Sequence, residues 1–104
     1  MANLDLPVKW LEMIQQILAQ HLPDAEVIVY GSRVTGTAYQ GNDLDLVVRN
    51  PRNLLVATGN LGKVSEVFSE SNVPILIDIL DWAQIPESFR EEIERTGVVI
   101  FPGD

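Results

Sequence analysis

Hydrophobic positions along this chain follow two spacings, one typical of helices and one typical of strands. In residues 8–21 the apolar side chains recur every three or four positions, which predicts an amphipathic helix, and Pro7 suits its first turn. Three other stretches are short, apolar and rich in β-branched residues, which predicts strands. They are AEVIVY at 25–30, DLDLVVR at 43–49 and VPILIDIL at 73–80.

The remaining pattern predicts two further helices and a last strand. Residues 54–70 place apolar side chains on one side of a helix, although Gly59 and Gly62 weaken its first half. Residues 86–95 form a short charged helix, and VVIF at 98–101 predicts a short strand. This order favours a single domain over residues 1–104, of α/β (α+β) class, with a small mixed β-sheet flanked by helices.

Charge and composition restrict the partners and the compartment. The 104 residues carry a net charge of −8, so we expect no direct nucleic-acid binding, whereas a basic protein or divalent cations would be attracted. The absence of cysteine excludes disulfides and thiolate metal sites, and it suits a cytoplasmic location. We expect no membrane span, because no apolar run is long enough, and no signal peptide.

A Gly31-Ser32 pair directly follows the first predicted strand. Glycine allows a ligand to approach the backbone closely, and successive N–H groups in such a turn can bind an anion. A short helix beginning near Ser32 would add its N-terminal amides, and the hydroxyl of Ser32 can bond a phosphate oxygen. The pair is therefore a candidate phosphate-binding turn, although taken alone it is more typical of a structural turn.

Three aspartates occupy positions where charge is unexpected. Asp43 and Asp45 are two residues apart on a predicted strand, so their side chains share a face. Asp78 interrupts the apolar run VPILIDIL, where a carboxylate is costly unless it is paired or metal-bound. If the two strands are neighbours, three carboxylates converge, and Mg²⁺ or Mn²⁺ is the favoured counter-charge. Asp81, at the strand end, is interpreted as a turn or helix-start residue.

The stretch GSRVTGTAYQGNDLDL, residues 31–46, resembles the signature of the DNA polymerase β-like nucleotidyltransferases, in which Gly-Ser and Asp-x-Asp are separated by ten residues. The short chain, the VPILIDILDW run with its third acid, and the C-terminal end resemble most closely the minimal nucleotidyltransferases, or MntA-like antitoxins. The resemblance covers most of the chain, from about Val27 to Phe101.

The resemblance implies a reaction and a role for each residue of the signature. A nucleoside monophosphate, most simply AMP from ATP, would pass to a hydroxyl group with release of pyrophosphate, with Mg²⁺ or Mn²⁺ as cofactor. The nucleotide-binding residues would be Gly31, Ser32 and Arg33. The catalytic and metal-binding residues would be Asp43, Asp45 and Asp78, the last also serving as candidate general base.

The resemblance also implies a partner. Minimal nucleotidyltransferases resemble one half of a two-gene unit whose other half is a helical HEPN-family protein, often a ribonuclease toxin, and characterised members silence it by adding AMP to a tyrosine. Two alternatives remain open. The chain would be a non-catalytic antitoxin that neutralises its partner by binding, as its acidic surface suggests, or the catalytic subunit of a two-chain nucleotidyltransferase acting on a small molecule.

Overall fold

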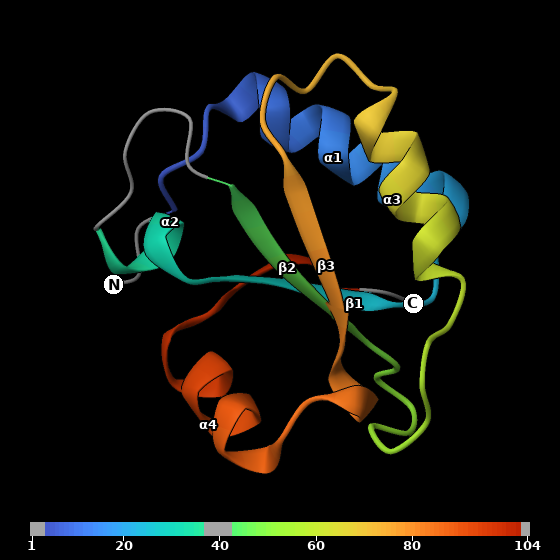
Figure 1. Cartoon of the computed structure of the whole chain (residues 1–104), viewed down its shortest axis with the longest axis vertical. Helices are drawn as coiled ribbons and strands as arrows, with labels where there is room; N and C mark the ends of the chain where they lie inside the picture. Colours follow the sequence, from blue (N-terminus) through green and yellow to red (C-terminus); the bar gives the residue numbers. More distant parts are fainter. Residues whose placement is uncertain (1–3, 37–42, 103–104) are drawn as a thin grey trace.

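A computed structural model describes residues 4–36 and 43–102 (Figure 1). In this part of the chain the strands form one mixed sheet with the order β3-β2-β1-β4. The central strand β1 (Glu26–Tyr30) pairs antiparallel with β2 (Leu44–Arg49) and with β4 (Val98–Phe101), whereas β2 pairs parallel with β3 (Ile77–Asp81). The predicted small mixed sheet is therefore confirmed.

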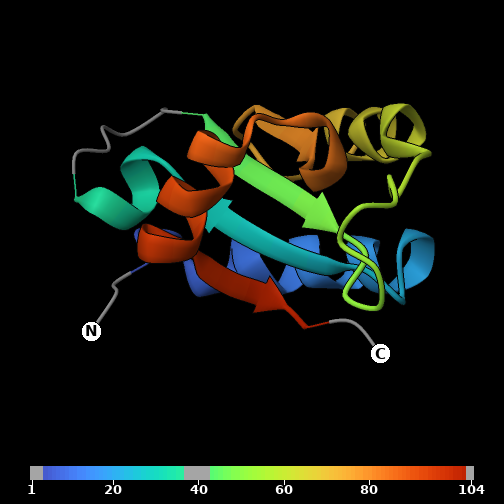
Figure 2. The ribbon, with the colours of Figure 1, turned by 90° about the horizontal axis from the view of Figure 1, so that it is seen from below.

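Helices cover both faces of this sheet (Figure 2). One face packs against α1 (Val8–His21) and α3 (Leu61–Ser69), and the other against α4 (Glu87–Thr96) and the short 3₁₀ helix η1 (Trp82–Gln84). A single helical turn, α2 (Ser32–Thr35), directly follows β1. Among the described residues, no helix has the length and apolar composition needed to cross a membrane.

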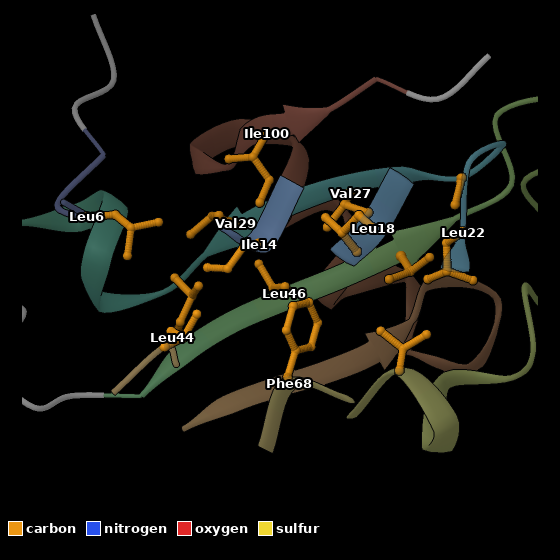
Figure 3. Close-up of a cluster of buried hydrophobic side chains, with 14 residues drawn as sticks. Leu6, Ile14, Leu18, Leu22, Val27, Val29, Leu44, Leu46, Phe68 and Ile100 are labelled. Atoms are coloured by element: carbon orange, nitrogen blue, oxygen red, sulfur yellow. The ribbon is translucent and has the colours of Figure 1, made fainter. Parts of the chain in front are cut away.

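The larger core lies between the sheet and the pair α1 and α3 (Figure 3). Alternation along β2 points Leu44, Leu46 and Val48 into this core, as predicted, and all three are fully buried. Val47 points to the opposite face and is also fully buried, because α4 and η1 cover that end of the sheet. The second face is therefore covered toward the end of β2 and open toward its start.

The prediction of a helix over 54–70 is wrong in its first half. Helix α3 begins only at Leu61, because Gly59 and Asn60 both adopt left-handed backbone angles just before it, with φ of 74° and 59°. Upstream, the Oδ1 atom of Asn50 accepts a hydrogen bond from the backbone N–H of Arg52, and that of Asn53 accepts one from Leu55. Such local hydrogen bonds favour turns over a helix. The third strand is also shorter than predicted and begins at Ile77.

Asp81 fixes the loop between β2 and α3. Its carboxylate is 6% exposed and accepts hydrogen bonds from the backbone N–H of Thr58, at 3.2 Å, and of Gly59, at 3.1 Å. Asp81 does precede η1, as the helix-start interpretation expects, but its side chain bonds the loop and does not cap that helix. Asp81 therefore joins the end of β3 to a segment more than 20 residues upstream.

We expect Asp81→Ala to lower the free energy of unfolding by about 1–3 kcal/mol, because two amides lose a charged acceptor. Urea denaturation measures this loss. Asp24→Ala, at an exposed aspartate in a turn, is the matched control and should change stability little. Equal losses for the two variants would show that the loop does not depend on the Asp81 carboxylate.

Candidate active site

Strand β1 ends in a turn that requires glycine. Gly31 has φ of 82° and ψ of −151°, a combination that residues with a side chain strongly disfavour. Its carbonyl accepts hydrogen bonds from the N–H groups of Val34 and Thr35, both at 3.1 Å, so that α2 begins immediately. The expectation of a short helix starting near Ser32 is confirmed, and the sheet passes into a helical turn within one residue.

The strand register places the aspartates side by side. In the parallel pair β2–β3, Asp45 lies directly opposite Asp78, and in the antiparallel pair β1–β2 it lies opposite Tyr30. Directly opposed residues share a face of the sheet, so these three side chains do as well. Asp43 comes just before the first residue of β2. The expectation that the strand of Asp78 neighbours that of Asp45 is therefore confirmed.

Asp45 also lies against the glycine turn. A Cβ atom built on Gly31 would come within 2.7 Å of Oδ2 of Asp45, closer than real contacts allow. The carboxylate therefore occupies the space that a side chain at position 31 would fill. As a result, the turn and the acids lie next to one another, with Gly31 directly after β1, Asp45 on β2 and Asp78 on β3.

The charges in this site repel one another. Burial raises the pKa of Asp45, and the negative charges of Asp78 and Asp43 raise it further. Burial, together with the charges of Asp45 and Asp78, raises the pKa of Tyr30 to about 12. The ion pairs found within the described residues involve other acids, namely Glu26, Glu92 and Glu94. The cluster thus holds negative charge that those ion pairs do not neutralise.

The raised pKa of Asp45 predicts a pH dependence of stability in a chelating buffer. Because the pKa of Asp45 is higher in the folded state than its ordinary value of 3.8, the folded state binds this proton more tightly than the unfolded chain does. Ionised Asp45 therefore destabilises the fold at neutral pH, and the penalty disappears as the pH falls through the folded pKa toward 3.8.

We expect Asp45→Asn to raise the melting temperature most at neutral pH, and this advantage over the native chain to shrink on acidification. Thermal denaturation of both proteins in EDTA, over a series of pH values, measures the difference between their melting temperatures. The titration of the other acids is common to both proteins and cancels in this difference. A difference that stays constant with pH would show that neither burial nor the neighbouring charges raise the pKa of Asp45.

The donor chemistry of the site fits a hard divalent cation. Carboxylate oxygens are the ligands that Mg²⁺ and Mn²⁺ prefer, and a cation would relieve the repulsion around Asp45. Over residues 4–36 and 43–102, however, no three acidic or histidine side chains are already arranged to hold a metal ion. Asp43 and Asp78 are exposed, so their side chains are free of the packing that would prevent them from turning toward Asp45.

The other predicted nucleotide-binding residues lie at the start of α2. Ser32 is its first residue and is half-buried. Arg33 is only 5% exposed, and its Nη1 donates to the carbonyl of Asp5 at 2.9 Å, while its own carbonyl accepts from the N–H of Asp5 at 2.7 Å. Arg33 thus fastens the N-terminal segment to α2, and its contact with phosphate stays a prediction. Positions 37–42 of the signature lie outside the described residues.

Comparisons with known proteins identify the family to which the chain belongs. The chain matches the family described as "Polymerase beta, Nucleotidyltransferase" over residues 12–104. It is 41% identical over 101 residues to a probable protein adenylyltransferase MntA of Haemophilus influenzae, a match that covers 95% of this chain and 85% of that protein.

Solved structures share the fold. A crystal structure of a toxin-antitoxin with AMP-PNP superimposes with a TM-score of 0.71 at 14% identity, covering 90% of this chain and 74% of that one. A crystal structure of the toxin-antitoxin MntA-HepT superimposes with a TM-score of 0.67 at 11% identity, covering 92% and 73%. These likenesses confirm the predicted nucleotidyltransferase fold.

Proposed function

This chain belongs to the polymerase beta nucleotidyltransferase family, and from that premise we propose that it transfers AMP from ATP to a hydroxyl of a partner protein. The acceptor is most simply a tyrosine of a HEPN-type toxin, so that the chain acts as an antitoxin. The pairing of Asp45 with Asp78 beside the Gly31 turn is the observation that carries the proposal. The similarity to a probable protein adenylyltransferase and to the antitoxin fold of a toxin-antitoxin complex supports it.

The glycine turn would receive the triphosphate. Gly31 has no side chain to block a phosphate group, and the hydroxyl of Ser32 can donate to a phosphate oxygen. Arg33 would act on phosphate only from its buried position, so we assign it first to holding α2 in place. The nucleotide would therefore enter beside the end of β1.

The aspartates would hold the cofactor and manage the proton. Asp43, Asp45 and Asp78 would be the ligands of Mg²⁺ or Mn²⁺, which when bound would stabilise negative charge on the α-phosphate. Asp78 would take the proton of the acceptor hydroxyl. The hydroxyl oxygen would bond to the α-phosphorus while the bond from that phosphorus to pyrophosphate breaks. Asp45 lies between Gly31 and Asp78, so it would link the phosphate end of the site to the acceptor end.

Incubation with labelled ATP, Mg²⁺ and a HEPN-fold partner tests the proposal. We expect label on a partner tyrosine, one pyrophosphate released for each AMP transferred, and loss of the partner's toxicity. The protein encoded beside this chain and a HepT toxin are the partners to use. Failure to label any of several partners with any of the four nucleoside triphosphates would refute the proposal.

Neutralisation by binding alone is the competing function, and the net charge of −8 favours it. It predicts that Asp45→Asn still silences the partner. A variant that binds the partner but leaves it toxic would exclude this alternative. A partner with a deep pocket for a small molecule, labelled only in the presence of that molecule, would instead indicate a two-chain small-molecule transferase.

A further inference from the structure

A groove lies between helix α4 and the loop that follows β2, away from the aspartates. It has a volume of about 240 Å³, and its floor is the ring of Trp82, which is itself buried. One wall comes from the loop and the other from α4. The residues that line the groove are Leu54, Trp82, Glu87, Arg90, Glu91 and Glu94.

The loop beside the groove exposes three consecutive apolar residues. Leu54, Leu55 and Val56 are 39%, 82% and 48% exposed. The loop is nevertheless held in place, because the side chains of Asn53 and Asp81 accept hydrogen bonds from its backbone amides. A contiguous apolar patch that the fold holds in solvent is typical of a surface that binds another protein.

Helix α4 presents an acidic stripe to the same groove. Glu87, Glu91 and Glu94 are all exposed, and their spacing places them on one side of the helix. Glu94 belongs to an ion pair, whereas the ion pairs found within the described residues include neither Glu87 nor Glu91. Arg90 is turned toward η1, since its Nε donates to the carbonyl of Trp82 at 2.8 Å. Two carboxylates of the stripe are therefore available to a basic partner.

The groove lies on the same face of the sheet as the aspartates, at its other end. Asp45, Val47 and Arg49 alternate onto this face of β2, and Val47 packs in the same core as Trp82. The guanidinium of Arg49 lies 4.6 Å from the centre of the Trp82 ring. About 13 Å of strand separates Asp45 from Arg49. A protein held in the groove therefore has a second part close enough to reach the acids.

We propose that this groove is a docking surface for a basic amphipathic helix of the partner protein, an inference that rests on the proposed function for the identity of that partner. Apolar side chains of the helix would cover the exposed patch at 54–56. Its lysines or arginines, spaced by one helical turn, would pair with Glu87 and Glu91, which have the same spacing. The groove would hold the partner, and the acceptor hydroxyl would come from another part of it.

Binding without nucleotide tests the surface, with a HepT toxin and the protein encoded beside this chain as the two partners. We expect Leu55→Arg, and the double variant Glu87→Lys with Glu91→Lys, each to raise the Kd of the complex about tenfold or more in calorimetry. All three positions are exposed, so the fold should persist. Val8→Arg and Glu12→Lys, at exposed positions of α1 on the opposite face, are the matched controls and should bind as the native chain does.

The salt dependence of binding separates charge pairing from a general effect on the fold. Added NaCl should weaken binding by the native chain, and this dependence should be smaller for the double lysine variant. A native chain that binds a partner but transfers no AMP would refute the proposed function and leave the docking surface in place. Binding by both groove variants at the level of their controls, or by the native chain to neither partner, would overturn the docking surface.

Discussion

Replacing Asp45 by asparagine is expected to lower the rate of AMP transfer by about 1,000-fold or more while the fold persists. Asp45 lies opposite Asp78 and against Gly31, so it connects both ends of the proposed site. The substitution keeps the shape of the side chain but removes a charged ligand of the expected cation. A loss of about 4 kcal/mol in transition-state stabilisation corresponds to this factor.

The same variant should gain stability in a chelating buffer, because asparagine removes the cost of burying the charge of Asp45 and its repulsion by Asp78 and Asp43. Added Mg²⁺ should raise the melting temperature of the native protein, since a ligand that binds only the folded state stabilises it, and should have little effect on the variant. Asp24→Asn controls for the loss of one negative charge. Transfer at the native rate would remove the argument for a metal site, and a variant less stable than the native chain in EDTA would make Asp45 a structural residue.

The sequence predicted best those elements whose pattern is local. The helix over 8–21 and the strand over 98–101 agree at both ends, because helical spacing and a short β-branched run each appear within one stretch. The prediction of a helix over residues 54–60 is wrong for a physical reason. Its apolar residues suggested a helix, but the Asn50 and Asn53 side chains compete for the backbone amides, and the carboxylate of Asp81 holds Thr58 and Gly59 in a loop.

The candidate site divides in the same way. Gly-Ser and Asp-x-Asp are close in sequence, so they could be recognised together as parts of one site. The single charge of Asp78 in an apolar run indicated a third acid, and the convergence of β2 and β3 could therefore be expected. The burial of Arg33 depends on Asp5, 28 residues away, which no local pattern reveals.

Gly31→Ala is expected to lower the rate of AMP transfer by about 100-fold. The added Cβ would lie 2.7 Å from Oδ2 of Asp45, which is too close, so the carboxylate would have to move. Since the displaced atom ends a short side chain, the contact costs little stability. The backbone costs more, about 1–3 kcal/mol, because alanine strongly disfavours φ of 82° with ψ of −151°. Single-turnover transfer and urea denaturation measure the two effects.

Gly36→Ala is the control that separates backbone strain from the contact with Asp45. Gly36 has φ of 84° as well, but a Cβ built there meets nothing within 4 Å. It should therefore lose about 1–2 kcal/mol of stability, as a left-handed alanine does, and keep near-native transfer. If both variants lost activity in proportion to stability, the glycine would serve only the turn. A selective loss in Gly31→Ala means that this residue is glycine because the carboxylate needs its space.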